Sequence, residues 1–278
     1  MDSDKRIIFV FVPTRYPGFD VTYHSLKRQV VDDDIKLVLC VADEFAPERG
    51  NELAEKFEDI GIDYVSFKMS KQKGYQRNLA ASYKQAMEFA RTIDADGFVT
   101  LQDYIWIPED GIQKFIDVSD NLEDPYHLLT GICHISGDPE PDLVVNPEDH
   151  FSIFAEPYDG KPETFWWTDV RLANNGGPGQ VKPTFPVEWE ANWGYIPRKA
   201  LYDKRLEYDE DFDKYVAYEN QDYALQAVER GYEVVIDTDN IAISLPHKQY
   251  WPSDEEEEAP LTLYNKNLLA VKHDSQSY

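Results

Sequence analysis

Short runs of apolar residues alternate with stretches of helical periodicity through the first hundred positions. The apolar runs are rich in Val, Ile and Phe, which is typical of strands buried on both faces of a parallel sheet. They cover residues 7–12, 35–41, 63–67 and 97–101. Between them, apolar side chains recur three or four positions apart over residues 21–30, 51–60 and 75–93. This alternation predicts an α/β fold with a mostly parallel central sheet flanked by helices.

The periodic pattern stops over residues 137–185 and returns afterwards. The irregular stretch is rich in Pro, Gly, Asn and Asp with interleaved aromatic residues, so we expect only short elements there. Beyond it, the pattern predicts regular structure over 199–206, a helix over 220–230 and strands over 233–236 and 241–245. We find no internal repeat and no linker between two independently folding parts.

The charge of the chain restricts its partners. Among 278 residues, 27 Lys and Arg stand against 53 Asp and Glu, which gives a net charge of −26. Such a chain repels phosphate backbones, so nucleic acid is disfavoured as a partner unless a local basic cleft receives it. Cys40 and Cys133 lie in apolar surroundings, which predicts buried free thiols. No apolar run is long enough for a leader or a membrane span, so we expect a cytoplasmic protein without stable membrane insertion.

Common catalytic and cofactor motifs are absent from the sequence. It contains no glycine-rich P-loop, no GxGxxG, no CxxC pair, no HExxH and no GxSxG. Polar residues instead follow each predicted strand, at Thr14-Arg15, Asp43, the loop before Tyr75 and Gln102-Asp103. Open α/β sheets bind ligands at the carboxyl ends of their strands, so these positions predict a site that relies on carboxylates.

Six segments then follow one another in an order that resembles the family 2 glycosyltransferases and their GT-A relatives. The resemblance covers about two thirds of the chain. The segments are VPTRYPGF, LVLCVADEF, KGYQRNLAASYKQA, GFVTLQDYIWIPEDGIQKF, NWGYIPRKAL and, last, YENQDYALQAVERGYEVVID with SLPHK. The fourth segment is similar to the strand, acidic metal-binding turn and Pro-led helix of these enzymes, and the last to their E-D-x-D helix, strand and terminal histidine.

This resemblance implies a fold, a domain organisation and a reaction. The fold is a GT-A type, Rossmann-like sheet in a single domain over residues 1–278. Residues 1–105 would form the half that binds the nucleotide sugar, 106–250 the acceptor-side half and 251–278 a tail. The reaction would transfer a sugar, with inversion, from a nucleoside-diphosphate donor, which we expect to be a UDP-sugar, to a hydroxyl acceptor. A saccharide is the favoured acceptor, with a protein or a modified nucleobase as alternatives.

The resemblance also assigns residues to roles. Asp103 and His247 would hold Mn²⁺ or Mg²⁺. Glu219 and Asp222 are candidates for the general base, with Asp222 slightly favoured. Trp193 and Gly194 fall in the acceptor-side segment. The donor-binding positions are Pro13, Thr14, Arg15, Asp43, Lys73, Arg77, Gln102 and Asp103.

Departures from the family pattern leave alternatives open. Gln102 and Tyr104 flank Asp103 where aspartates are common, so transfer without a metal is one alternative, and Glu219-Asn220-Gln221-Asp222 stands where E-D-x-D is usual. Each residue also has a structural interpretation: Asp103 as a helix cap, the two acids as partners of a helix dipole, the tryptophans as core. Two other functions remain, a nucleotidyltransferase and a non-catalytic carbohydrate-binding or scaffold protein.

Overall fold

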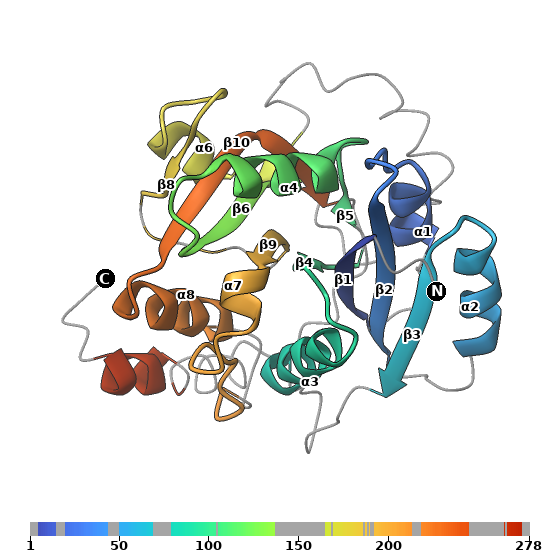
Figure 1. Ribbon diagram of the computed structural model, residues 1–278. Coiled ribbons are helices and arrows are strands. Elements are labelled where there is room, and N and C mark those ends of the chain that lie inside the picture. Colours follow the sequence, from blue (N-terminus) through green and yellow to red (C-terminus); the bar gives the residue numbers. More distant parts are fainter. Residues whose placement is uncertain are drawn as a thin grey trace.

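A mixed, mostly parallel sheet forms the centre of the molecule (Figure 1). The structure is a computed structural model, and it describes residues 5–14, 20–43, 50–68, 79–103, 105–136, 165–167, 169–185, 187, 189, 192–212, 218–244, 264 and 266–273. Ten strands of these residues form one sheet in the order β3-β2-β1-β4-β9-β6-β10-β5, with β7 beside β6 and β8 beside β10. The predicted α/β class is confirmed.

The first half of the chain alternates strand and helix, as its hydrophobic pattern predicts. Its strands are β1 (Arg6–Thr14), β2 (Ile35–Asp43), β3 (Asp63–Lys68) and β4 (Gly97–Leu101). Its helices are α1 (Asp20–Lys27), α2 (Gly50–Glu58) and α3 (Leu79–Thr92). β1 pairs in parallel with β2 and β4, and β2 pairs in parallel with β3.

The second half contains shorter and more varied elements. Its strands are β5 (Ile105–Trp106), β6 (His127–Ser136), β7 (Phe165–Trp167), β8 (Val181–Pro183), β9 (Trp193–Pro197) and β10 (Glu233–Ser244). Its helices are α4 (Gly111–Asn121), α6 (Val170–Asn174), α7 (Arg198–Leu201) and α8 (Glu219–Glu229). Residues 266–273 are also helical, and we call them the C-terminal helix.

Strand direction brings six strand ends to one side of the sheet. β6 and β10 are parallel to each other, and β9 lies antiparallel to both β4 and β6. The strands β1 to β4 form one parallel group, and β6 and β10 form another. Because β9 is antiparallel to both groups, the two groups run in the same direction. The carboxyl ends of β1, β2, β3, β4, β6 and β10 meet at what we call the C-terminal edge of the sheet.

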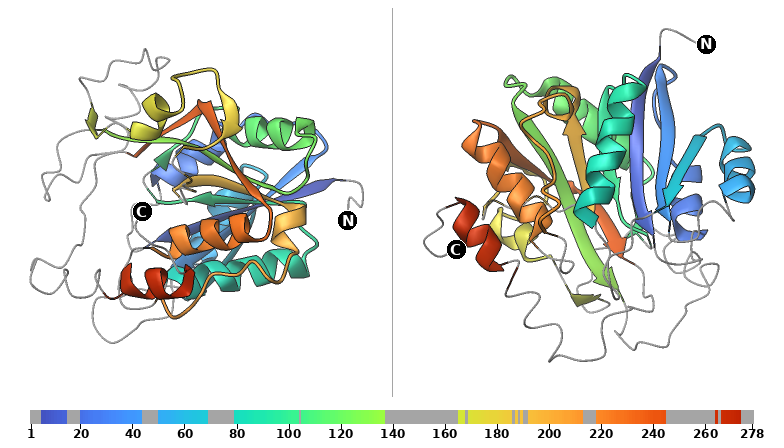
Figure 2. Two further views of the ribbon diagram at one scale, coloured as in Figure 1. Left: turned by 90° about the vertical axis from the view of Figure 1, so that its left-hand side faces the viewer. Right: turned by 90° about the horizontal axis from the view of Figure 1, so that it is seen from below.

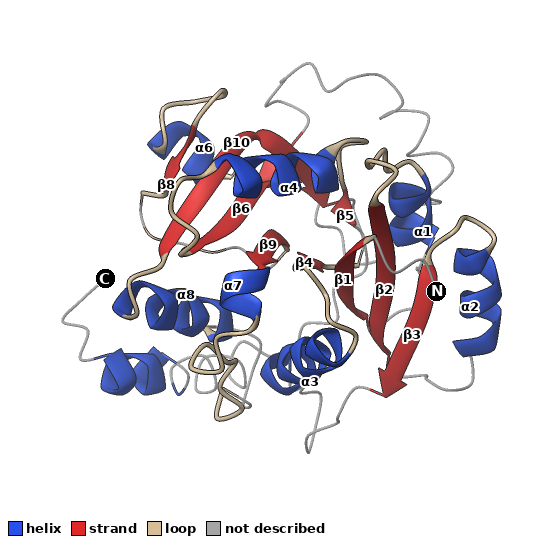
Figure 3. Cartoon of the chain, in the orientation of Figure 1, coloured by secondary structure: helices blue, strands red, loops and turns tan. Residues whose placement is uncertain are grey.

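Helices cover both faces of the sheet (Figures 2 and 3). In β1, Ile8 and Val10 face a core shared with α1, α2 and α4, whereas Phe9 and Phe11 face a core shared with α3, α7 and α8. This alternation follows from the two-residue period of a strand. Burying each phenylalanine contributes roughly 1.5–3 kcal/mol.

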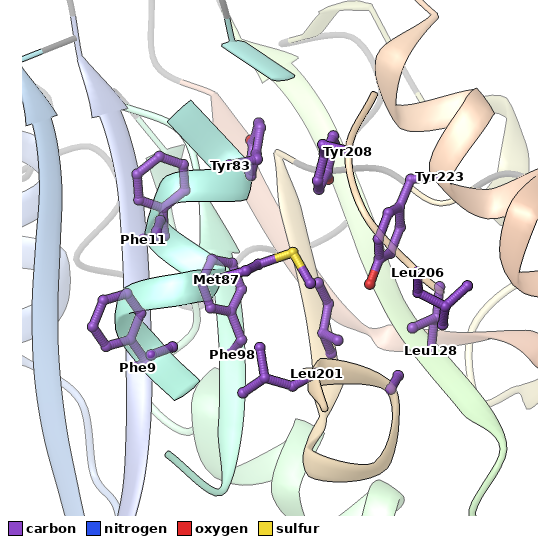
Figure 4. Close-up of a cluster of buried hydrophobic side chains, with 14 of the residues drawn as sticks. Phe9, Phe11, Tyr83, Met87, Phe98, Leu128, Leu201, Leu206, Tyr208 and Tyr223 are labelled. Atoms are coloured by element: carbon purple, nitrogen blue, oxygen red, sulfur yellow. The ribbon is translucent and has the colours of Figure 1, made fainter. Parts of the chain in front are cut away.

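Three stacked tyrosines join α3 to α8 within the second core (Figure 4). The ring of Tyr208 lies 4.5 Å from that of Tyr83 on α3 and 4.7 Å from that of Tyr223 on α8, measured between centroids. Both pairs are close to parallel, with interplanar angles of 14° and 11°. The stack fixes α8 against the rest of the molecule.

The structure refines several expected elements. The two strands expected at 233–236 and 241–245 are one strand, β10, whose register against β6 shifts between Ile236 and Ile241. α1 ends at Lys27, before the exposed Val30. Cys40 and Cys133 are buried free thiols, as expected. No helix within the described part of the chain has the length and apolar character needed to cross a membrane.

Candidate functional site

The C-terminal edge gathers the predicted donor-binding residues that the structure describes. Thr14, the last residue of β1, pairs in register with Asp43, the last residue of β2. Asp43 is 2% exposed and Pro13 is buried. β1 and β4 are also neighbours, and Gln102 follows the end of β4, where its backbone N–H donates to the backbone carbonyl of Asn192 at 3.3 Å. The ends of three adjacent strands therefore lie in one region, as expected for an open α/β sheet.

Asp103 lies in the turn that leads from β4 to β5. Its side chain is half-buried, and α4 begins at Gly111 with Asp110 at the N-cap position, so Asp103 does not cap that helix. β5 pairs with the end of β10, where Ile105 stands opposite Ser244. Asp103 is therefore two residues from a position that pairs with Ser244, and His247 follows Ser244 by three residues. The pairing places Asp103 near the end of β10, and His247 lies outside the described residues.

Glu219 and Asp222 occupy the first turn of α8, as the sequence predicts. Tyr218 precedes them with a φ of 73°, in the left-handed region, and turns the chain into the helix. Both acids are buried, Glu219 at 3% and Asp222 at 0% exposed. Asn220 donates to Glu219 Oε1 at 3.4 Å and accepts from the Tyr208 hydroxyl at 3.2 Å.

The carboxylate of Asp222 is closely surrounded by donors. His273 Nε2 lies 2.7 Å from Oδ1, and Lys272 Nζ lies 2.8 Å from Oδ1 and 2.9 Å from Oδ2. Gln226, one turn along α8, donates to Oδ2 at 2.6 Å. Lys272 and His273 belong to no sequence motif, so their contact with Asp222 could not be predicted from the sequence.

Trp193 and Gly194 are core residues in the structure. The Trp193 ring is 0% exposed, lies 4.6 Å from the Phe115 ring, and donates its indole N–H to Asn240 Oδ1 at 3.0 Å. A Cβ atom at Gly131 would collide with this ring. Gly194 is buried in β9, in register with Thr100 and Thr130. The Trp193 ring has no open face for a sugar, so packing, and not stacking on a ligand, accounts for it.

Several predicted residues lie outside the described part of the chain. These are Arg15, Lys73, Arg77 and His247. Most of the irregular region falls there too, and its described remainder contains only β7, α6 and β8, which are three to five residues long. Among the described residues, no group of three or more His, Cys, Asp or Glu side chains is arranged to hold a metal ion.

A depression of about 520 Å³ lies at the opposite edge of the sheet, where β6 and β10 begin. It contains none of the residues predicted for the donor site. Its lining combines tyrosines with charged side chains: Tyr126, Arg198, Lys199, Tyr202, Asp203, Arg205 and Tyr232. Arg198 is already paired with Asp94 and Asp96, and Arg205 with Asp203. These pairs connect Arg198 with the turn before β4 and Arg205 with Asp203 in its own loop.

Comparison with known proteins places the chain by its fold. In sequence, no known protein family and no curated protein matches it. In structure, it is similar to GalNAc-T7 with UDP, GalNAc and Mn²⁺, with a TM-score of 0.59 and 11% identity over 97% of this chain and 48% of that one. It is also similar to S. aureus TarS 1–349 in complex with UDP, with a TM-score of 0.54 and 11% identity.

The TarS comparison covers 95% of this chain and 64% of the TarS chain, and the complex of TarS with UDP-GlcNAc gives the same TM-score at 12% identity. The chain thus spans less than two thirds of the length of these proteins. At such low identity the similarity establishes the fold, which is that of the GT-A glycosyltransferases. The resemblance found in the sequence is confirmed at this level.

Proposed function

We propose that this chain is a glycosyltransferase that moves a sugar from a UDP-sugar to a hydroxyl acceptor, with inversion at the sugar carbon. The main support is the position of Asp43, Asp103 and Glu219. Asp43 ends β2, Asp103 follows β4, and Glu219 opens α8. The fold is similar to that of TarS and GalNAc-T7 in their complexes with UDP. Carboxylates at the C-terminal edge suit a polar ligand with hydroxyl and amide hydrogens to donate.

The donor would lie across the ends of β1, β2 and β4. Asp43, with Pro13 and Thr14 on the neighbouring strand, would accept hydrogen bonds from the nucleoside, and Gln102 would border the same region. Arg15, Lys73 and Arg77 would offset the diphosphate charge, which matters in a chain whose net charge is −26.

The donor set fits a divalent ion. Asp103 would supply a carboxylate oxygen and His247 an imidazole nitrogen, both of which suit Mn²⁺ or Mg²⁺. Asp103 and His247 would hold Mn²⁺ or Mg²⁺, which would stabilise the negative charge that develops on the departing diphosphate.

Glu219 is the better of the two candidate bases. Inverting transfer needs a carboxylate that accepts the proton of the acceptor hydroxyl while its oxygen attacks the sugar carbon and the bond to the diphosphate breaks. Both oxygens of Asp222 already accept from Lys272, His273 or Gln226. We therefore assign the base to Glu219, which reverses the preference drawn from the sequence.

Nucleotide binding tests the donor site directly. We expect calorimetric titration to show micromolar binding of UDP in the presence of Mn²⁺, in preference to GDP, CMP and ADP. Asp103→Asn should weaken that binding by roughly 10-fold or more through loss of a metal ligand. Asp110→Asn, at the exposed start of α4, is the matched control and should bind UDP as the wild type does. Absence of binding by any nucleotide, with or without Mn²⁺, would contradict the donor site and favour a scaffold.

Substitution of the base tests the reaction. We expect Glu219→Gln to lower the release of UDP from a UDP-sugar by about 10²–10⁴-fold, the usual contribution of a general base, while UDP affinity stays unchanged. Glu58→Gln, on the exposed surface of α2, is the control. A Glu219→Gln enzyme as active as the wild type would exclude Glu219 as the base.

A further inference from the structure

The C-terminal helix contacts α8 through two adjacent side chains. In Figures 1 and 2 this helix lies beside α8, although the two are far apart in the sequence. Lys272 and His273 both contact Asp222, which is 0% exposed. A buried carboxylate is costly unless cations and hydrogen-bond donors compensate it, and here the end of the chain provides them.

His273 bridges two turns of α8. Its side chain is 3% exposed, with Nε2 2.7 Å from Asp222 Oδ1 and Nδ1 2.6 Å from Glu229 Oε1. Carboxylate oxygens only accept hydrogen bonds when ionised, so both contacts are satisfied when both ring nitrogens carry a proton. These two contacts tie the first turn of α8 to its last.

Lys272 joins α8 to the loop before it. Its Nζ lies 2.8 Å from Asp209 Oδ2 and 2.8 Å from Asp222 Oδ1, and 5.7 Å from the centre of the Phe212 ring. Burial acts to lower the pKa of Lys272, but the hydrogen bonds to Asp209 and Asp222 outweigh it and hold the pKa above its ordinary value. The lysine is therefore charged, and it fixes the chain on both sides of residues 213–217.

We propose that Lys272 and His273 are positioning residues for Glu219. By pairing with Asp222 they hold the first turn of α8, which also contains Glu219, in place at the C-terminal edge. Asp222 is then the anchor of the C-terminal helix and does not act as a base. This inference rests on the proposed function, because Glu219 has a reaction to serve only in a transferase.

The first experiment needs no activity. Hydrogen exchange on the intact protein should show faster exchange over residues 219–222 and 266–273 in Lys272→Met than in the wild type. Lys266→Met, which removes an exposed lysine of the same helix, is the matched control and should exchange as the wild type does. In the Asp222→Asn background, Lys272→Met should have a smaller effect, because the buried charge that Lys272 compensates is already gone. Unchanged exchange in Lys272→Met would overturn the proposal.

The second experiment separates positioning from a purely structural role. We expect Lys272→Met and His273→Phe to lower kcat for UDP release roughly 10- to 100-fold while UDP affinity stays within about twofold, since misplacing a catalytic group costs rate and not binding. Lys272→Arg, which keeps the charge, should restore most of the rate. Unchanged kcat, or higher kcat in Lys272→Met, would overturn the proposal, and higher kcat would identify the helix as inhibitory. A wild type without UDP release but with the expected exchange pattern would instead refute the proposed function.

Discussion

Burial favours the neutral form of two histidines, His127 and His134. His127 Nδ1 lies 2.7 Å from the carbonyl oxygen of Asp124, so it donates, and Nε2 lies 3.0 Å from the Ser119 hydroxyl. His134 Nδ1 accepts the backbone N–H of Asp169 at 3.0 Å. Burial lowers the pKa of both imidazoles below their ordinary value.

This lowered pKa predicts loss of stability on mild acidification. A histidine whose pKa is lower in the folded state contributes stability above its unfolded pKa, and this contribution is lost as the pH falls through the folded value. We expect the urea concentration at the unfolding midpoint to decrease as the pH is lowered from about 7 to about 5. This range lies above the one in which unperturbed carboxylates titrate. His127→Gln should flatten this dependence. A wild-type midpoint constant over this range would contradict the assignment.

The roles of Asp43, Asp103 and Glu219 stay predictions. Local pattern suggested these residues because each ends a strand, follows one or opens a helix. Trp193 was predicted to bind the acceptor, but it is buried in the core. The sequence does not distinguish an aromatic residue that packs in the core from one that binds a ligand. Lys272 and His273 were missed because their role depends on a contact across 50 residues of chain.

Among the elements, α6 depends on one buried ion pair. Asp169 caps this short helix by accepting from the Arg171 amide at 3.0 Å, and also accepts from the Cys133 amide in β6 at 3.1 Å. The Arg171 guanidinium pairs with Asp169 at 2.6 Å and donates to the Gly131 carbonyl at 3.0 Å. The two side chains are 3% and 1% exposed. The pair attaches α6 to β6.

Removing one partner of this pair should be costly. We expect Arg171→Met to lower the free energy of unfolding by about 3–5 kcal/mol, because it leaves the Asp169 charge buried without compensation. Lys36→Met breaks the exposed pair with Asp63 and should cost no more than about 1 kcal/mol. Urea unfolding of both variants checks this. Equal effects would mean that Asp169 finds another partner or water in the variant.

Element prediction succeeded where the hydrophobic period was long and regular. β4 has the predicted limits, and β1, β2 and β3 differ from theirs by one or two residues at an end. β9 was not predicted as a strand, because its five residues include a glycine and a proline, which have low strand propensity. β9 joins β4 to β6, and pairing with strands distant in sequence cannot be predicted from a local pattern.

For the whole molecule, the sequence predicted the architecture but not the arrangement of the strands. Hydrophobic pattern shows which faces are buried, and the order of segments indicated the GT-A fold. Neither shows that the two parallel groups of strands are joined through an antiparallel strand from the second half of the chain. That arrangement is what directs the ends of β4 and β6 to the same edge and brings Asp103 and α8 to one side of the sheet.

The position of β9 in the sheet also affects how the chain comes together over time. In the pairing of β1 with β2, Arg6 lies opposite Ile35, which is close in sequence. In the pairing of β4 with β9, Gly97 lies opposite Pro197, which is far along the chain. Closing so long a loop is slow, and contacts distant in sequence slow folding more than local ones do. During synthesis, one edge of β4 therefore stays unpaired until β9 has left the ribosome, and β6 lacks both β9 and β10 until then. Unpaired strand edges promote association between chains, so the interval before β9 emerges is when this protein is most exposed to aggregation.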